Sequence, residues 1–117
     1  MSTLAVGTIK SVSSAAPVFQ NTSGTEIGQL AFAWGNIEPS GSSSIANDFN
    51  ISSVTEVNQN TYDLSFTNAS SNANYATAID VQTETNHFTQ SHTTSGFRFR
   101  TGGNLSSANF SFIVFGS

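Results

Sequence analysis

This chain lacks several features on which common classes of protein depend. It has no cysteine, which excludes a disulfide framework and a thiolate metal site. Charged residues make up only 9% of its 117 residues, far below the usual share of about one quarter. With three basic residues and a pI near 4.7, it has too little positive charge for a nucleic-acid surface.

Long apolar segments are missing as well. No apolar run approaches the roughly 20 residues of a membrane-spanning helix, so we expect no membrane insertion. The opening letters, MSTLAVGTIK, contain no basic region followed by an apolar stretch, so they are not expected to be a secretory signal.

Small polar residues are common where most proteins have charged ones. Serine, threonine and asparagine occur 20, 14 and 12 times, which is 46 of the 117 positions. Such a composition can indicate disorder, but disordered chains usually lack aromatic residues and carry a high net charge. Here ten Phe, two Tyr and one Trp accompany a net charge of −4, so we expect one folded domain with a modest core.

Apolar residues alternate with polar ones over short segments, which is the pattern of half-buried strands. The clearest example is Tyr62–Phe66, where Tyr, Leu and Phe alternate with Asp and Ser. Strong helix formers are few, and several such segments are separated by polar turns. The sequence therefore predicts an all-β protein, a small antiparallel β-sandwich or barrel-like head at 21–117, preceded by an extended arm at 1–20.

Local patterns refine this expectation near the N-terminus. Leu4–Ile9 is a candidate strand, and the NTSGT letters of Asn21–Thr25 indicate a turn. Leu30, Phe32 and Trp34 fall on one face of the next segment, which predicts that the tryptophan is buried.

A change of phase follows in the next strand. Phe49 and Ile51 share a face, but Val54 is out of phase with them. A one-residue slip exchanges the two faces of a strand, so we expect a bulge or bend near Ser52–Ser53. A compact hairpin turn is predicted at Asn58–Asn60.

Catalytic chemistry finds little support in the sequence, and we expect no enzyme activity and no cofactor. Serines are common, but none lies in a G-x-S-x-G elbow. His87 and His92 have an odd spacing, which puts them on opposite faces of a strand and argues against a shared metal within one chain. A trimer could still bring three copies of one histidine to an axis. The acidic residues fall at turns and on polar faces, as solvating charges do: Glu26, Glu38, Asp48, Glu56, Asp63, Asp80 and Glu84.

Candidate contacts between subunits come from two segments. Arg98 and Arg100 share one strand face and could hold a carboxylate of a neighbouring subunit by bidentate hydrogen bonds, or simply protect an edge strand. The FSFIVF letters are apolar on both faces and must be buried on both or lie at a subunit contact. This makes Phe110, Phe112 and Phe115 interface candidates and favours a homo-oligomer.

Several short sequence blocks stand out along the chain. In order, they are M-S-T-L-x-V-x-T-I (Met1–Ile9), N-x-S-G-T-E-I-G (Asn21–Gly28), A-W (Ala33–Trp34), Asn50–Thr55, Tyr62–Thr67, Asn74–Tyr75, S-G-F-R-F-R-T (Ser95–Thr101) and F-G (Phe115–Gly116). Together they resemble a β-structured module of bacteriophage virion appendages, abundant in tail-fibre and head-decoration proteins of cyanophages. One departure is that A-W-G-N-I-E-P-S-G stands where the family usually has A-W-V-N-F-N-G-T-G.

The resemblance implies a virion structural protein, with the trimeric assembly common among fibre modules. Leu4, Val6 and Ile9 would belong to an attachment arm that docks onto other capsid or tail proteins or wraps neighbouring protomers. The head would project outward, where polar loops could contact host surface polysaccharide. The alternative is a free carbohydrate-binding module or lectin, for which exposed aromatic residues would be the evidence.

Overall fold

The computed structural model describes residues 2–10, 12, 17–38, 44–82, 86–102 and 109–116. Within these ranges the chain is all-β, without a helix, and therefore without a helix of the length and apolar character that crossing a membrane requires. The chain separates into two compact units, Met1–Leu30 and Ala31–Ser117. The first unit thus extends beyond Gln20 and includes a hairpin.

Ten strands form in the described ranges, and all of their pairings are antiparallel. They are β1 (Phe19–Gln20), β2 (Glu26–Gly28), β3 (Ala33–Glu38), β4 (Ser44–Phe49), β5 (Ile51–Asn58), β6 (Thr61–Phe66), β7 (Ala76–Val81), β8 (His87–Thr93), β9 (Gly96–Thr101) and β10 (Phe110–Phe115).

The first unit contains one short hairpin, β1–β2. Its turn confirms the prediction from the NTSGT letters: Gly24 has φ 82°, and the Asn21 side chain accepts hydrogen bonds from the Ser23 and Thr25 amides at 3.0 and 2.9 Å. The strand expected at Leu4–Ile9 is wrong, because these residues are exposed and pair with none of the described strands.

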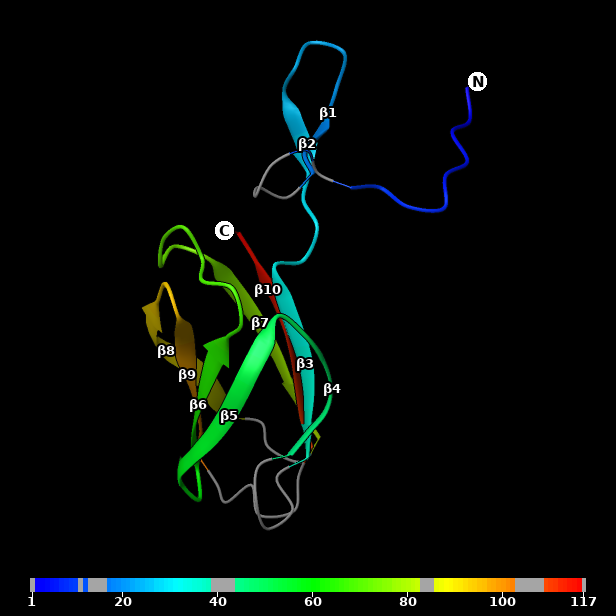
Figure 1. The fold of residues 1–117 in the computed structure, drawn as a ribbon. Helices are drawn as coiled ribbons and strands as arrows, with labels where there is room; N and C mark the ends of the chain where they lie inside the picture. The colour runs from blue at the N-terminus through cyan, green and yellow to red at the C-terminus, as the bar shows by residue number, and fades with distance from the viewer. Residues whose placement is uncertain are drawn as a thin grey trace. The chain divides into compact units, whose positions relative to one another are not determined.

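The second unit is a sandwich of two four-stranded sheets (Figure 1). One sheet has the order β4-β3-β10-β7 and is called the β3 sheet below; the other has the order β5-β6-β9-β8 and is called the β6 sheet. The two layers pack face to face, as sheets with one apolar face do. The predicted antiparallel β-sandwich is confirmed.

Aromatic side chains fill the space between the two sheets. The predicted alternation of β6 and β9 is confirmed, since their large apolar residues are buried and the polar residues between them are partly exposed. Tyr62 and Phe99 of the β6 sheet meet Phe110 of the β3 sheet, with ring centroids 5.6 and 4.6 Å from the Phe110 ring. The buried core consists of Ala33, Ile37, Ile51, Tyr62, Leu64, Phe66, Tyr75, Val81, Phe97, Phe99, Phe110, Phe112 and Val114.

The faces of β3 are the reverse of the sequence expectation. Ala33, Gly35 and Ile37 point into the core, whereas Trp34 points outward and is 38% exposed. The reason is space: a Cβ atom at position 35 would lie only 2.8 Å from Cζ of Phe112. The strand therefore turns its small residues toward the large rings of β10, and the prediction of a buried tryptophan is wrong.

The chain passes from one sheet to the other at Asn50, between β4 and β5. Asn50 has φ 61°, and its side chain accepts a hydrogen bond from the Asn68 amide at 2.8 Å. This corner separates Phe49 from Ile51, so the two do not share a face as expected: Phe49 is exposed and Ile51 is buried. The register shift between Ile51 and Ser53 confirms the predicted bulge, and the hairpin turn before β6 is also confirmed.

Candidate binding faces of the sandwich

An ion pair lies on the outer face of the β6 sheet. Asp63 on β6 stands directly opposite Arg98 on β9, and both side chains point away from the core. Arg98 Nε and Nη2 donate to the two carboxylate oxygens of Asp63 at 2.6 and 2.8 Å. These hydrogen bonds hold the pKa of Asp63 below its ordinary value, although partial burial opposes them.

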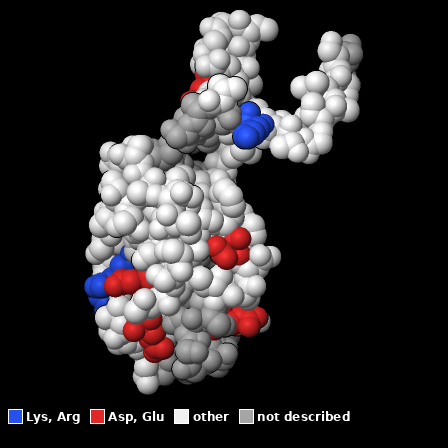
Figure 2. Space-filling view, in the orientation of Figure 1, with Lys and Arg blue, Asp and Glu red and all other residues white. Residues whose placement is uncertain are grey.

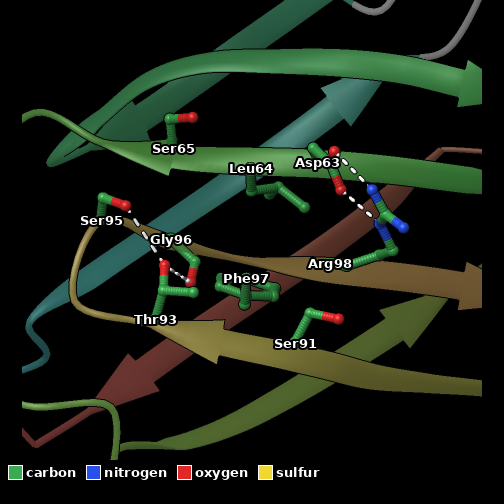
Figure 3. Close-up of a pocket in the computed structure, with 9 residues that line it drawn as sticks. All are labelled: Asp63, Leu64, Ser65, Ser91, Thr93, Ser95, Gly96, Phe97 and Arg98. Carbon is green, nitrogen blue, oxygen red and sulfur yellow. Dashed lines mark hydrogen bonds and ion pairs between the residues drawn. The ribbon is translucent and has the colours of Figure 1, made fainter.

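A polar hollow of about 290 Å³ adjoins this ion pair (Figure 3). Its hydroxyl groups come from Ser65 on β6, from Ser91 and Thr93 on β8, and from Ser95 in the turn after β8. Ser91 has φ 52°, and Thr93 Oγ1 donates to the carbonyl of Gly96 at 3.1 Å. The carboxylate at its edge is already bound by Arg98, so it offers no free base to activate a hydroxyl. The hollow is lined by Asp63, Leu64, Ser65, Ser91, Thr93, Ser95, Gly96, Phe97 and Arg98.

The two arginines predicted as interface residues both have contacts within their own chain. Arg98 binds Asp63, and the guanidinium carbon of Arg100 lies 5.9 Å from the ring centroid of Phe88. Arg100 Nε is buried without a hydrogen-bond partner in the described part of the chain. Binding of a neighbouring subunit's carboxylate by these arginines stays a prediction.

The two histidines lie on the same side of the β6 sheet, contrary to the expected opposite faces. The register of β8 shifts near Ser91, which removes the simple alternation between them. His87 Nε2 lies 3.1 Å from the carbonyl of Ile79 on β7, and the His92 ring stacks on Tyr75 at 4.9 Å. In the part of the chain that the structure describes, no three potential metal ligands gather at one place.

The phenylalanines of β10 divide between the core and the surface. Phe110 and Phe112 are 1% and 4% exposed and pack against aromatic rings of the β6 sheet. Their burial is therefore complete within one chain and needs no partner. Phe115 is 40% exposed on the opposite face of the strand, and its contact with another subunit stays a prediction.

A row of apolar side chains crosses the outer face of the β3 sheet. The register places Trp34 between Phe49 on β4 and Ile113 on β10. Trp34 and Phe49 are 38% and 53% exposed, and Ile113 is partly exposed. We call these three residues the aromatic row. Sequence reasoning missed it because it assigned the larger residues of β3 to the core; the small residues Ala33 and Gly35, facing a strand rich in Phe, were the available signal.

A second row lies next to the aromatic row, two residues along each strand. The register aligns Asn47, Asn36, Ser111 and Asp80 across β4, β3, β10 and β7, and all four are exposed. We call them the polar row. Among the described residues, no hydrogen bond ties any of these four side chains to another part of the chain. Two amides, a hydroxyl and a carboxylate are therefore free to bind a ligand.

Comparison of the chain with protein-family models, with curated protein sequences and with solved structures found no match. The class of protein is therefore defined by the fold: an antiparallel β-sandwich with a separate N-terminal unit. Charged residues make up 9% of the chain, and most of the sandwich face drawn in Figure 2 is uncharged.

Proposed function

We propose that this chain is a structural component of a bacteriophage virion, a surface appendage of the head or tail that is held by its N-terminal arm. The sequence resemblance to virion modules, together with the β-sandwich, supports the proposal. In this role the chain binds and assembles with other proteins, with no catalytic step and no cofactor. The observation that carries the proposal is the exposure of the arm.

The arm presents apolar side chains without covering them. Leu4, Val6 and Ile9 are 82%, 52% and 63% exposed, and no described strand pairs with this segment. Burial of such side chains against another protein would stabilise a complex by about 1.5–3 kcal/mol for each fully buried residue, before the cost of ordering the arm. Attachment to other virion proteins gives these residues a partner.

Mass spectrometry of purified phage particles tests the virion role. We expect the chain at an integer copy number per capsid vertex or per tail. Its absence from particles would contradict the proposal. Light scattering of the isolated protein tests the associated trimer, which should have a mass near three times the 12.3 kDa of one chain. A monomer in solution would contradict that part alone.

A free carbohydrate-binding module is the second candidate, and one observation favours it. The single tryptophan of the chain was expected in the core, but Trp34 lies on the surface beside another exposed aromatic residue. Exposed aromatic rings are suited to contact with sugars. Absence from particles combined with measurable glycan binding would favour this candidate over the virion role.

A further inference from the structure

We infer that the outer face of the β3 sheet is a binding site for neutral polysaccharide. The inference rests on the surface-contact part of the proposed function, because a host-facing appendage and a free lectin would both use such a site. It goes further by assigning the site to particular residues and by specifying the charge of the ligand.

The aromatic row supplies an apolar platform for a sugar ring. One face of many sugar rings consists of C–H groups, whose partial positive charge is attracted to the negative face of an aromatic ring. Trp34 and Phe49 are cross-strand neighbours on the outside of a sheet, so their Cβ atoms lie next to each other and both side chains start from the same part of the face. Exposed apolar surface of this kind commonly marks a binding site.

The polar row supplies hydrogen-bond partners for sugar hydroxyls. Positions two residues apart on a strand are separated by about 6.6 Å, so the polar row runs close beside the aromatic row. Neighbouring strands are about 4.8 Å apart, so four strands span about 14 Å across the sheet. Asn36 and Asn47 can each donate and accept, which matches hydroxyl groups that do the same. A chain of more than one sugar ring therefore fits along the two rows.

Charge on the face selects a neutral ligand. The three basic residues of the chain are Lys10, Arg98 and Arg100, so the strands of the β3 sheet contain none. The polar row contains the carboxylate of Asp80, which would repel an anionic polysaccharide. A second copy of this chain is a poorer occupant, because a face-to-face contact would bury that carboxylate and the free amides without charged partners.

Tryptophan fluorescence offers a direct test, because Trp34 is the only tryptophan in the chain. The full-length protein is titrated with four neutral oligosaccharides: cellohexaose, maltohexaose, xylohexaose and hexa-N-acetylchitohexaose. We expect at least one to shift the emission to the blue and to protect Trp34 from quenching by acrylamide. Oligogalacturonate, which is anionic, should have no effect. The absence of a response to all four neutral probes would overturn the inference.

Substitutions then locate the site by calorimetric titration with the responding sugar. Trp34→Ala should abolish measurable binding, and Phe49→Ala and Asn36→Ala should each weaken it about tenfold, a change of about 1.4 kcal/mol. Phe88→Ala is the matched control: Phe88 is 48% exposed on the other sheet, and its loss should leave the affinity unchanged. Thermal unfolding confirms that each variant is folded.

Two results would overturn the site assignment even if a sugar binds. One is unchanged affinity in Trp34→Ala and Asn36→Ala. The other is a light-scattering mass of Trp34→Ala below that of the wild type, which would show that this face is an interface with a second copy of the chain. Failure here is separable from failure of the virion role, because the chain would still be found in particles.

Discussion

The ring of Phe112 on β10 occupies the space that a side chain at Gly35 on β3 would need. A Cβ atom there would lie 2.8 and 2.9 Å from Cζ and Cε1 of that ring. Phe112 is itself held in place, with Phe97 packed edge-on at 5.5 Å between ring centroids. This contact decides which face of β3 points inward, and thereby places Trp34 on the surface.

Replacing Gly35 with alanine should therefore destabilise the sandwich. The added methyl group must push the Phe112 ring into neighbours that are already packed, at a cost of about 1–3 kcal/mol. Chemical denaturation of Gly35→Ala measures this cost. In a Phe112→Leu background the shorter side chain leaves room, so the cost of Gly35→Ala should fall by roughly half.

Gly102→Ala is the control for the change of residue type. Its Cβ would meet the exposed side chain of Asn86 at 3.0 Å, which is free to move away. We expect little effect on the free energy of unfolding. Equal losses in the two alanine variants would show that Phe112 is not the cause.

Periodicity in the sequence correctly predicted the inward face of strands that carry all their large apolar residues on one side. In β6 and β9 the alternation of Phe, Tyr and Leu with polar residues has only one interpretation, and the structure agrees. In β3 both sides carry apolar residues, and the choice between them depends on Phe112, which is more than 70 residues away in the chain. A local pattern contains no information about that partner, so the prediction failed there.

The same limit explains the corner at Asn50. The phase change before β6 predicted the bulge, but it did not predict that the chain leaves one sheet and enters the other.

The polar row could not be predicted from the sequence either. Asn36 and Ser111 belong to it only because β3 and β10 are neighbours in this register.

The Tyr75 hydroxyl connects the start of β7 to the β8–β9 turn. It donates toward the carbonyl oxygens of Gly96 at 2.6 Å and Thr93 at 3.1 Å, and the side chain is 5% exposed. Tyr75→Phe removes the donor and leaves buried carbonyl groups less well satisfied, which should cost about 1–2 kcal/mol. Chemical denaturation measures the loss.

Tyr62→Phe is the matched control for that prediction. Tyr62 is also buried, but among the described residues no hydrogen bond ties its hydroxyl to the chain. The same chemical change should therefore cost less there. A larger loss at Tyr62 than at Tyr75 would contradict the role of the hydrogen bond.

The ion pair between Asp63 and Arg98 should make the free energy of unfolding depend on pH in the acid range. The folded state holds the pKa of Asp63 below its ordinary value of 3.8, chiefly through hydrogen bonds from Arg98. This contribution is complete above the ordinary pKa and is lost as the pH falls through the lowered one. Because both side chains remain partly exposed, the contribution is small.

Asp63→Asn should lose less stability than the wild type as the pH falls below the ordinary aspartate pKa of 3.8, when denaturation is measured across the acid range. Arg98→Gln should flatten the same part of the curve, since it removes the donors that lower the pKa. High salt should reduce the difference between wild type and variants. An unchanged acid profile in both variants would contradict the assignment.

The N-terminal unit should be dispensable for folding of the sandwich. Every residue of the buried core cluster lies between Ala33 and Val114, so removal of residues 1–20 or 1–30 takes no member from it. Both truncated proteins should therefore unfold within a few degrees of the full chain and keep its far-ultraviolet circular dichroism. Both truncated proteins should also lose attachment, measured as the amount of added protein that sediments with particles that lack their own copy of the chain.

Trp34→Ala, which keeps the arm, is the control for attachment and should still sediment with the particles. Failure of the shorter truncation to fold would place the arm in the core, and attachment without the arm would move the docking surface to the sandwich.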